Sequence, residues 1–217
     1  MRSAVSHCFS PGVDYVASFE DELSQSHGIK SFMADASVVS PPINNSYFYF
    51  IKKFLGNRSE GNFITLSDWI DSSLNGDERE LILQMDIEGG EYDVLTYESS
   101  DTLARFSVMV IEFHGWQSIF DEQFLERLTE IFNKIYQNFS ICHVHPNNCC
   151  GIAEENGISV PRVLEITFIR NDLIDKFALD TAVKLPHKLD FRNLKDQADI
   201  QMPEAWWKKS RHETNFN

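Results

Sequence analysis

The chain has 217 residues, of which 42% are hydrophobic, and a formal net charge of −14 at pH 7, which fits one substantial domain with its own core. The negative charge argues against nucleic acid and anionic membranes as partners, because both are bound through basic surfaces. No apolar run approaches the roughly 18 residues of a membrane helix, and the N-terminus lacks an export signal, so we expect a cytoplasmic protein. The four cysteines do not form a disulfide framework, so reduced thiols are expected.

Strand and helix patterns alternate along the first 170 residues. Apolar, β-branched or aromatic runs predict strands, in chain order, over residues 6–9, 29–34, 47–55, 81–85, 106–113, 140–144 and 163–169. Helices are predicted over residues 18–27, from Ser67 or Asp68 onward, over 90–99 and over 120–139. Ser18 is the expected cap of the first helix and Gly28 its end. The alternation predicts an α/β fold with a mostly parallel sheet and helices on both faces. No convincing helix separates the last two strands, so the final strand is expected to enter antiparallel.

The segment Leu81-Ile-Leu-Gln-Met-Asp-Ile-Glu-Gly-Gly-Glu-Tyr-Asp-Val-Leu95 is the most informative part of the chain. Its apolar run has the composition of a buried strand and stops at Asp86 and Glu88. Gly89-Gly90 then permits a tight turn, and Glu91 falls in the first turn of a helix, where the helix dipole favours an acid. A buried strand that ends in carboxylates just before a helix is typical of a ligand site in α/β sheets, because buried carboxylates need partners.

Polar residues also end neighbouring predicted strands. Asp35 follows the second strand, 23 positions after Gly12, close to the offset of roughly 20 residues at which an acid meets ribose hydroxyls in dinucleotide folds. Glu112 and His114 end a later strand, and the segment His145-Pro-Asn147 follows the next one. These side chains are expected to meet at one edge of the sheet.

Each of these residues also has a purely structural interpretation. Asp35 can cap a turn, and Asp68 can favour the start of a helix. Asp86 and Glu88 can be solvated acids at a helix N-terminus. His114 can simply form a hydrogen bond within its loop.

The chain resembles the FkbM-type S-adenosylmethionine-dependent methyltransferases, a family of class I methyltransferases. The strongest match is Met85-Asp-Ile-Glu-Gly-Gly-Glu91, followed by Val94-Leu95. Supporting matches are Ser67-Asp-Trp69, Val110-Ile-Glu-Phe-His114, His145-Pro-Asn-Asn148, Leu164-Glu-Ile-Thr-Phe168, and Ser10-Pro-Gly-Val-Asp14 with Ser18-Phe-Glu20. The resemblance implies a Rossmann-like class I methyltransferase domain over residues 1–171, with a C-terminal extension over residues 172–217 that packs on it.

The resemblance also implies a cofactor and an acceptor. The cofactor would be S-adenosylmethionine, and the acceptor an oxygen on a sugar, a polysaccharide precursor or a secondary metabolite. The residues implied for cofactor binding are Ser10, Gly12, Asp35, Asp68, Asp86 and Glu88. Those implied for acceptor binding are Glu112, His145 and Asn147.

Two residues are expected to act in catalysis. His114, with an ordinary pKa of about 6.5, would accept the proton of the acceptor hydroxyl, and Asp86 would lie close to the methyl donor. Asp86, Glu112, His114 and His145 are also residue types that hold a divalent cation. No metal is predicted, because nothing in their spacing fixes one.

The chain departs from the family in two respects. Its first loop keeps only Gly12, and a loop poor in glycine favours an alternative function, a methyltransferase-like binding protein without catalysis. The acids Asp86, Glu88 and Glu112 oppose that alternative. The chain also starts close to the first strand, so we expect an N-terminal segment that covers the site to be missing, which would leave apolar surface for a homodimer. A nicotinamide dehydrogenase would need a Gly-x-Gly-x-x-Gly loop, which this chain lacks.

Overall fold

The computed structural model describes residues 5–174 and 185–203. Its centre is a seven-stranded sheet in the order β3-β2-β1-β6-β7-β11-β8. The strands are β1 (His7–Pro11), β2 (Lys30–Ala34), β3 (Phe48–Ile51), β6 (Leu81–Met85), β7 (Phe106–His114), β8 (Phe139–Pro146) and β11 (Val163–Arg170). β11 runs antiparallel to β7 and β8, whereas the other neighbouring strands pair in parallel. The predicted α/β sheet with an antiparallel strand near the C-terminus is confirmed.

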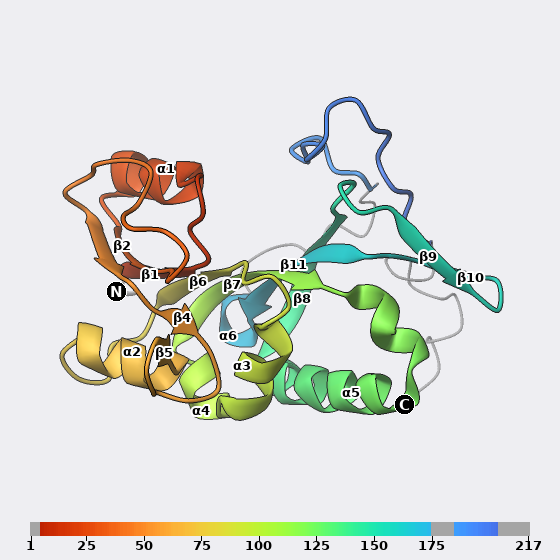
Figure 1. Cartoon of the computed structure of the whole chain (residues 1–217). Coiled ribbons are helices and arrows are strands. Elements are labelled where there is room, and N and C mark those ends of the chain that lie inside the picture. Colours follow the sequence, from red (N-terminus) through yellow and green to blue (C-terminus); the bar gives the residue numbers. More distant parts are fainter. Residues whose placement is uncertain (1–4, 175–184, 204–217) are drawn as a thin grey trace.

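Helices cover the two faces of the sheet unequally (Figure 1). α1 (Ser18–His27) lies on one face, and on the other lie α2 (Leu66–Ser73), α3 (Glu91–Tyr97), α4 (Ser100–Leu103) and α5 (Glu122–Tyr136). A short 3₁₀ helix, η1 (Trp116–Phe120), precedes α5, and α6 (Asn171–Ile174) follows β11. No helix within residues 5–174 or 185–203 is both long and apolar enough to cross a bilayer.

The hydrophobic core lies between the sheet and the larger helical layer. Alternate residues of the central strands point into it, among them Phe9, Leu83, Met109 and Phe168, all with no exposed surface. α5 adds Leu128, Ile131 and Ile135, which recur at helical spacing and are buried. The opposite face of β6 and β7 is half-buried and mixes apolar with polar side chains, among them Ile82, Gln84 and Val108.

The predicted strand over residues 47–55 is wrong as a single element. β3 ends at Ile51, and Phe54–Leu55 forms β4, which pairs with β5 (Phe63–Ile64) in a separate sheet. The N–H of Lys53 donates to the carbonyl of Ile51 at 3.0 Å. This tight bend separates the two short strands.

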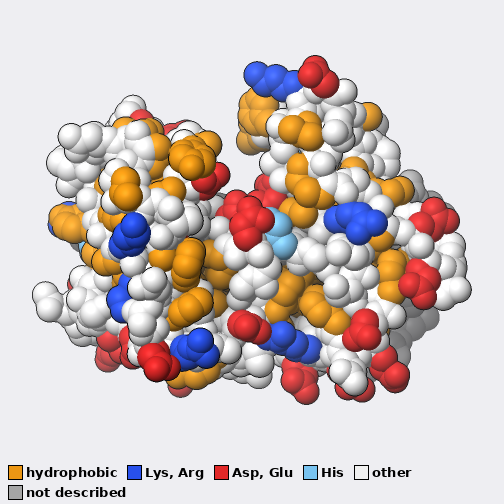
Figure 2. Space-filling model, in the orientation of Figure 1, with side chains coloured by type: hydrophobic (Ala, Val, Ile, Leu, Met, Phe, Trp, Pro, Cys, Tyr) orange, Lys and Arg blue, Asp and Glu red, His pale blue; other side chains and the backbone are white. Residues whose placement is uncertain are grey.

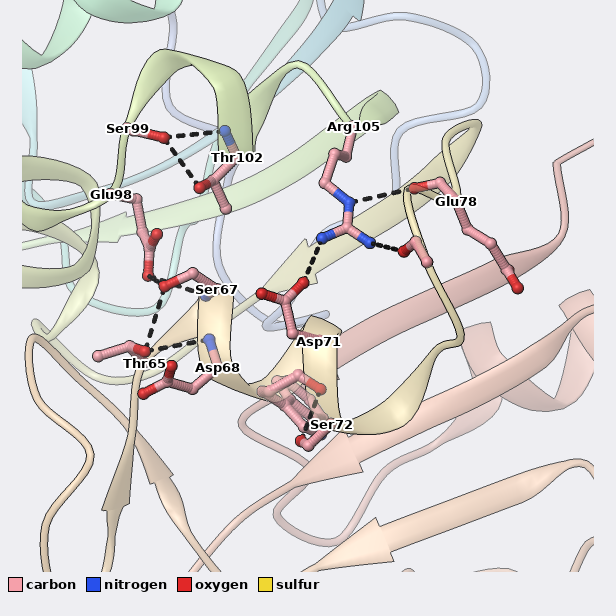
Figure 3. Close-up of polar contacts among 12 residues, drawn as sticks. Thr65, Ser67, Asp68, Asp71, Ser72, Glu78, Glu98, Ser99, Thr102 and Arg105 are labelled. Atoms are coloured by element: carbon pink, nitrogen blue, oxygen red, sulfur yellow. Dashed lines mark hydrogen bonds and ion pairs between the residues drawn. The ribbon is translucent and has the colours of Figure 1, made fainter.

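The predicted cap of α1 is wrong, and α2 begins at Leu66, one residue before the predicted start at Ser67. Ala17, not Ser18, is the N-cap of α1, and no side chain bonds there. α2 is capped by Thr65, whose Oγ1 accepts the N–H of Asp68 at 3.2 Å (Figure 3). The end of α1 at Gly28 is confirmed, because Gly28 has the left-handed φ of 65° that favours glycine.

The chain between β8 and β11 forms a β-hairpin, β9 (Ile152–Glu155) with β10 (Ile158–Pro161). Antiparallel neighbours such as β8 and β11 need no crossover helix, which explains the missing helical pattern. In the turn after β8 the structure joins Cys149 to Cys150 in a disulfide, so the expected reduced state is wrong for this pair, whose adjacency brings the two sulfurs together. Cys8 and Cys142 are free.

The expected C-terminal extension is described only at residues 172–174 and 185–203. There, the side-chain amide of Asn148 donates to the carbonyls of Leu194 and Gln197 at 2.9 and 3.2 Å. Its oxygen accepts the N–H of Leu194 at 2.8 Å. Residues 185–203 are thereby tied to the end of β8, and the division at residue 171 stays a prediction.

Candidate functional site

Acidic side chains and histidines meet where β6 and β7 end. Met85, the last residue of β6, pairs with Ile111 of β7, and Asp86 and Glu112 are the next residues along the chain. Glu112 pairs across to Glu165 on β11, and Glu165 to His145 on β8. Figure 2 shows acidic and histidine side chains at the bottom of a hollow between the lobe that contains α1 and the lobe that contains β9 and β10. The polar residues that were predicted to lie together are therefore closest to one another at the ends of β6 and β7.

His114 contacts three of these carboxylates. Its Nδ1 donates to Oε1 of Glu91 at 3.0 Å. Its Nε2 lies 3.4 Å from Oε2 of Glu88 and 3.8 Å from Oδ1 of Asp86. Burial alone would lower the pKa of His114, but the hydrogen bond that it donates to Glu91 and the charges of the nearby carboxylates raise this pKa to about 9. The expected pKa of about 6.5 is therefore wrong for the protein without ligands, in which the imidazole is protonated at neutral pH.

Asp86 and Glu112 form a close acidic pair. Burial, followed by the charge of Glu112 and a hydrogen bond with it, raises the pKa of Asp86 to about 8. Oδ1 of Asp86 is buried and accepts no hydrogen bond from a described residue. The side-chain amide of Asn147 donates to Glu112 at 2.7 Å, so this predicted acceptor-binding residue joins the pair.

Glu91 is the site residue that sequence reasoning missed. It has no exposed surface, and its Oε1 accepts the N–H groups of Ile87 and Gly89 at 3.2 Å each, besides His114. Its Oε2 is buried without a hydrogen-bond partner among the described residues. The predicted place of Glu91 in the first turn of a helix is confirmed, but the turn folds back over the side chain and buries it. The available signal was its place as the third acid of the 86–91 segment.

Glu88 occupies a strained position in the same turn. Its φ is 54°, in the left-handed region that costs a non-glycine residue roughly 1–2 kcal/mol. The side chain is largely exposed, yet its carboxylate lies beside Nε2 of His114. Strained residues of this kind often lie at functional sites, which supports the predicted role of Glu88.

Asp35 holds the loop after β1. Its Oδ2 accepts the N–H groups of Val13 and Asp14 at 3.1 and 3.0 Å, and its Oδ1 accepts the N–H and hydroxyl of Ser37 at 2.7 and 2.6 Å. Burial alone would raise the pKa of Asp35, but these hydrogen bonds lower it. Both oxygens already have partners, so a ribose diol would have to share them.

Gly12 and Ser10 contribute to packing in this structure. Gly12 has φ of 86°, and a Cβ there would lie 1.5 Å from the carbonyl oxygen of Asp86, so only glycine lets the first loop approach β6 this closely. Ser10 is buried, with its Oγ in hydrogen-bond contact with Glu20 on α1 and 2.7 Å from Oε1 of Gln84 on β6. If Gly12 and Ser10 affect cofactor binding as predicted, they would do so by setting the shape of the first loop.

Asp68 and His145 do not join the cluster. Asp68 is exposed at the start of α2, where its carboxylate accepts the hydroxyl of Ser59. His145 lies 3.7 Å from Glu165, measured from Nδ1 to Oε1. None of the hydrogen bonds or ion pairs described for these two residues reaches His114. Their binding roles stay predictions.

The sequence comparison identifies the family. Residues 19–139, more than half of the chain, match the family described as Methyltransferase FkbM domain. The chain belongs to the FkbM methyltransferase family. The matched region of this FkbM chain contains Asp35, Asp86, Glu91, Glu112 and His114. No curated protein matches the chain.

Solved structures similar to this FkbM chain are methyltransferases of low sequence identity. A putative DNA modification methyltransferase encoded within an Escherichia coli prophage is 11% identical with a TM-score of 0.49, covering 85% of this chain and 52% of its own. A precorrin-6y C5,15-methyltransferase from Geobacter metallireducens GS-15 is 13% identical with a TM-score of 0.37, covering 77% and 82%. The FkbM chain thus spans about half the length of the prophage protein. Both TM-scores lie below 0.5, and both identities are low.

Family membership implies S-adenosylmethionine as the methyl donor, and the chemistry of the site fits it. The cofactor carries a positively charged sulfonium and an ammonium group. Asp86, Glu88 and Glu112 place three carboxyl groups at the sheet edge, and Oδ1 of Asp86 has no described hydrogen-bond partner. The ribose end fits less directly, because the donors of the first loop already engage Asp35.

Proposed function

We propose that this FkbM-family protein uses S-adenosylmethionine to methylate a hydroxyl oxygen of a sugar, a polysaccharide precursor or a secondary metabolite. The observation that carries the proposal is the cluster of Asp86, Glu112 and His114, within the family-matched region and at the carboxyl ends of β6 and β7. Carboxylates accept hydrogen bonds from hydroxyls, and the amide of Asn147 can both donate and accept. Such a set suits a hydroxylated acceptor.

The reaction needs the acceptor to be held in line and to lose a proton. When bound, S-adenosylmethionine supplies a methyl group on a positively charged sulfur. Transfer of this methyl group to a hydroxyl oxygen would break the carbon–sulfur bond of the cofactor and release the hydroxyl proton, which a residue of this chain would have to accept. We assign the acceptance of this proton to the ionised form of Asp86, whose pKa of about 8 suits a base near neutral pH. The protonated His114, whose Nδ1 is held by Glu91 and whose Nε2 faces Asp86, stabilises that carboxylate. Orientation of the acceptor contributes much of the remaining rate.

The proposed cofactor contacts pair carboxyl groups of the protein with the cationic groups of the cofactor. Asp86 and Glu88 meet the sulfonium and ammonium groups, and Asp35 shares its oxygens with the ribose. Ser10 and Gly12 shape the loop beside it. Asp68 has no contact in this structure that supports its expected role.

The acidic character of the protein favours a neutral or cationic acceptor over nucleic acid. The net charge is −14, and the site adds several carboxylates, which would repel phosphates. Tyr15 and Val16, 80% and 70% exposed beside the first loop, supply apolar surface that a second subunit would bury, so the expected homodimer stays a proposal.

Cofactor binding is tested by thermal unfolding with S-adenosylhomocysteine. A ligand at 100 times its dissociation constant stabilises the native state by about 2.7 kcal/mol, which corresponds to a rise in Tm of several degrees for a chain of this size. We expect this rise in the wild type and in the exposed control Asp101→Asn, and a smaller one in Asp35→Asn and Asp86→Asn. No rise in the wild type at millimolar ligand would favour the binding-protein alternative, and a rise with a nicotinamide cofactor would favour a dehydrogenase.

Methyl transfer is tested with a labelled methyl donor and a panel of hydroxylated and amine-only acceptors. A labelled methyl ether is the expected product. Loss of a group that moves a proton typically slows a reaction 10²–10⁴-fold, so Asp86→Asn and His114→Asn should each lower turnover by at least about tenfold. Unchanged turnover in His114→Asn would remove His114 from the reaction.

A further inference from the structure

Asp86, Glu91 and His114 come from three different elements and converge on one small volume. Asp86 follows β6, Glu91 begins α3, and His114 ends β7. One potential metal-ligand atom from each residue lies within 4.8 Å of those from the other two. The group is therefore more compact than the set of four residues considered from the sequence, in which His145 is paired with Glu165 instead.

Two carboxylate oxygens of this group are buried and accept no hydrogen bond from a described residue, although one of them lies 3.8 Å from Nε2 of His114. They are Oδ1 of Asp86 and Oε2 of Glu91. Leaving a buried acceptor without a hydrogen bond costs about 1–3 kcal/mol, and more for a charged group. Glu91 cannot turn outward easily, because it is fully buried and three donors hold its other oxygen. A hydrogen-bond donor or a cation beside these two oxygens would remove this cost.

We propose that Asp86, Glu91 and His114 bind a divalent cation such as Mn²⁺. Carboxylate oxygens suit Mn²⁺ and Mg²⁺, and an imidazole extends the set toward transition metals such as Zn²⁺. Metal–ligand bonds of about 2.0–2.3 Å place ligand atoms up to about 4.6 Å apart. The observed spacing therefore requires only small side-chain movements.

The bound cation would change how the site activates the acceptor hydroxyl. A hydroxyl coordinated to a divalent cation loses its proton more readily, so His114 would act as a ligand rather than as the base expected from the sequence. Glu112 and Asn147 would remain for the acceptor. This consequence rests on the proposed function, whereas cation binding itself does not.

The experiment measures Mn²⁺ binding to the tag-free full chain after chelator treatment, from the loss of the electron paramagnetic resonance signal of the free ion. We expect one ion per wild-type chain. Asp86→Asn and Glu91→Gln should each weaken binding at least tenfold. Glu130→Gln, which changes an exposed acid on α5, should bind like the wild type. Competition with Mg²⁺ and Zn²⁺ then ranks the cations.

Circular dichroism identifies any variant that fails to fold. If Glu91→Gln fails to fold, the Mn²⁺ affinities of Asp86→Asn and His114→Asn test the cation site. No binding by the wild type at millimolar Mn²⁺ overturns the proposal, as does wild-type affinity in folded Asp86→Asn. Thermal shifts with S-adenosylhomocysteine, recorded without metal, separate the two proposals. A shift without Mn²⁺ binding rejects only the cation site, and Mn²⁺ binding without a shift rejects only the cofactor.

Discussion

At the scale of single residues, some residues that are expected to bind ligands also hold the protein together. Gly12 lets the first loop approach the carbonyl of Asp86, and Asp35 binds the amides of that loop. Both residue types can bind a ligand or stabilise the fold. A carboxylate accepts hydrogen bonds from a ligand or from the backbone, and a glycine allows either a ligand or another segment to approach its backbone closely. The two roles are separated by measuring stability as well as binding.

Gly12→Ala should be strongly destabilising. The added Cβ would overlap the carbonyl oxygen of Asp86 at 1.5 Å, so the backbone must move, at a cost of about 3 kcal/mol or more. Gly28→Ala is the matched control, since its φ is also positive but nothing lies within 4 Å of the new Cβ. It should cost roughly 1–2 kcal/mol. Denaturant unfolding measures both, and equal losses would contradict the packing argument.

Asp35→Asn should lower stability at neutral pH and matter less in acid. Hydrogen bonds lower the pKa of Asp35 in the folded protein below its unfolded value of about 3.9. The stabilisation is therefore fully present above pH 4 and is lost as the pH falls through the lower folded value. We expect a loss of about 2–4 kcal/mol at pH 7, shrinking steadily toward pH 2. A pH-independent difference in unfolding free energy would show that the charge of Asp35 does not matter.

At the scale of elements, the helix starts follow local hydrogen bonds more than residue preference. Ser18 is a favourable capping type, but α1 starts without a side-chain cap, whereas Thr65 caps α2. A serine or threonine caps a helix only if the backbone before the helix orients the side-chain hydroxyl toward the free N–H groups of the first turn. A short sequence motif does not reveal this.

Thr65→Ala should destabilise the protein by about 1 kcal/mol, because the N–H of Asp68 loses its partner. Ser18→Ala should change the unfolding free energy by less than about 0.5 kcal/mol. Thermal or denaturant unfolding of the two variants compares them directly. A larger loss in Ser18→Ala than in Thr65→Ala would reverse the assignment of caps.

At the scale of the whole molecule, the uneven covering of the sheet creates the hollow. Four helices bury one face, whereas α1 and the β9–β10 lobe stand at opposite ends of the other (Figures 1 and 2). The segment 185–203 belongs to the second lobe and is tied to β8 through Asn148. The hollow therefore depends on contacts between distant parts of the chain.

Asn148→Ala should loosen this segment without unfolding the sheet. The N–H of Leu194 bonds to the side chain of Asn148 at 2.8 Å, so we expect its hydrogen exchange to accelerate at least tenfold, equivalent to about 1.4 kcal/mol. Asn193→Ala is the control, since within residues 5–174 and 185–203 the side chain of the exposed Asn193 makes a single 3.5 Å hydrogen bond, to Glu165. Unchanged exchange at Leu194 in the Asn148 variant would show that other contacts hold the segment.

The sequence by itself determined the order and type of the main elements, the antiparallel last strand and the family, because apolar periodicity and short motifs are local properties. It also brought Asp86, Glu112 and His114 to one edge, since parallel strands end together. Only the tertiary structure decided that Glu91 holds His114, that Asp35 is already bonded, and that the pKa of His114 is about 9. These properties depend on burial and on distances between side chains from different elements, which spacing along the chain does not encode.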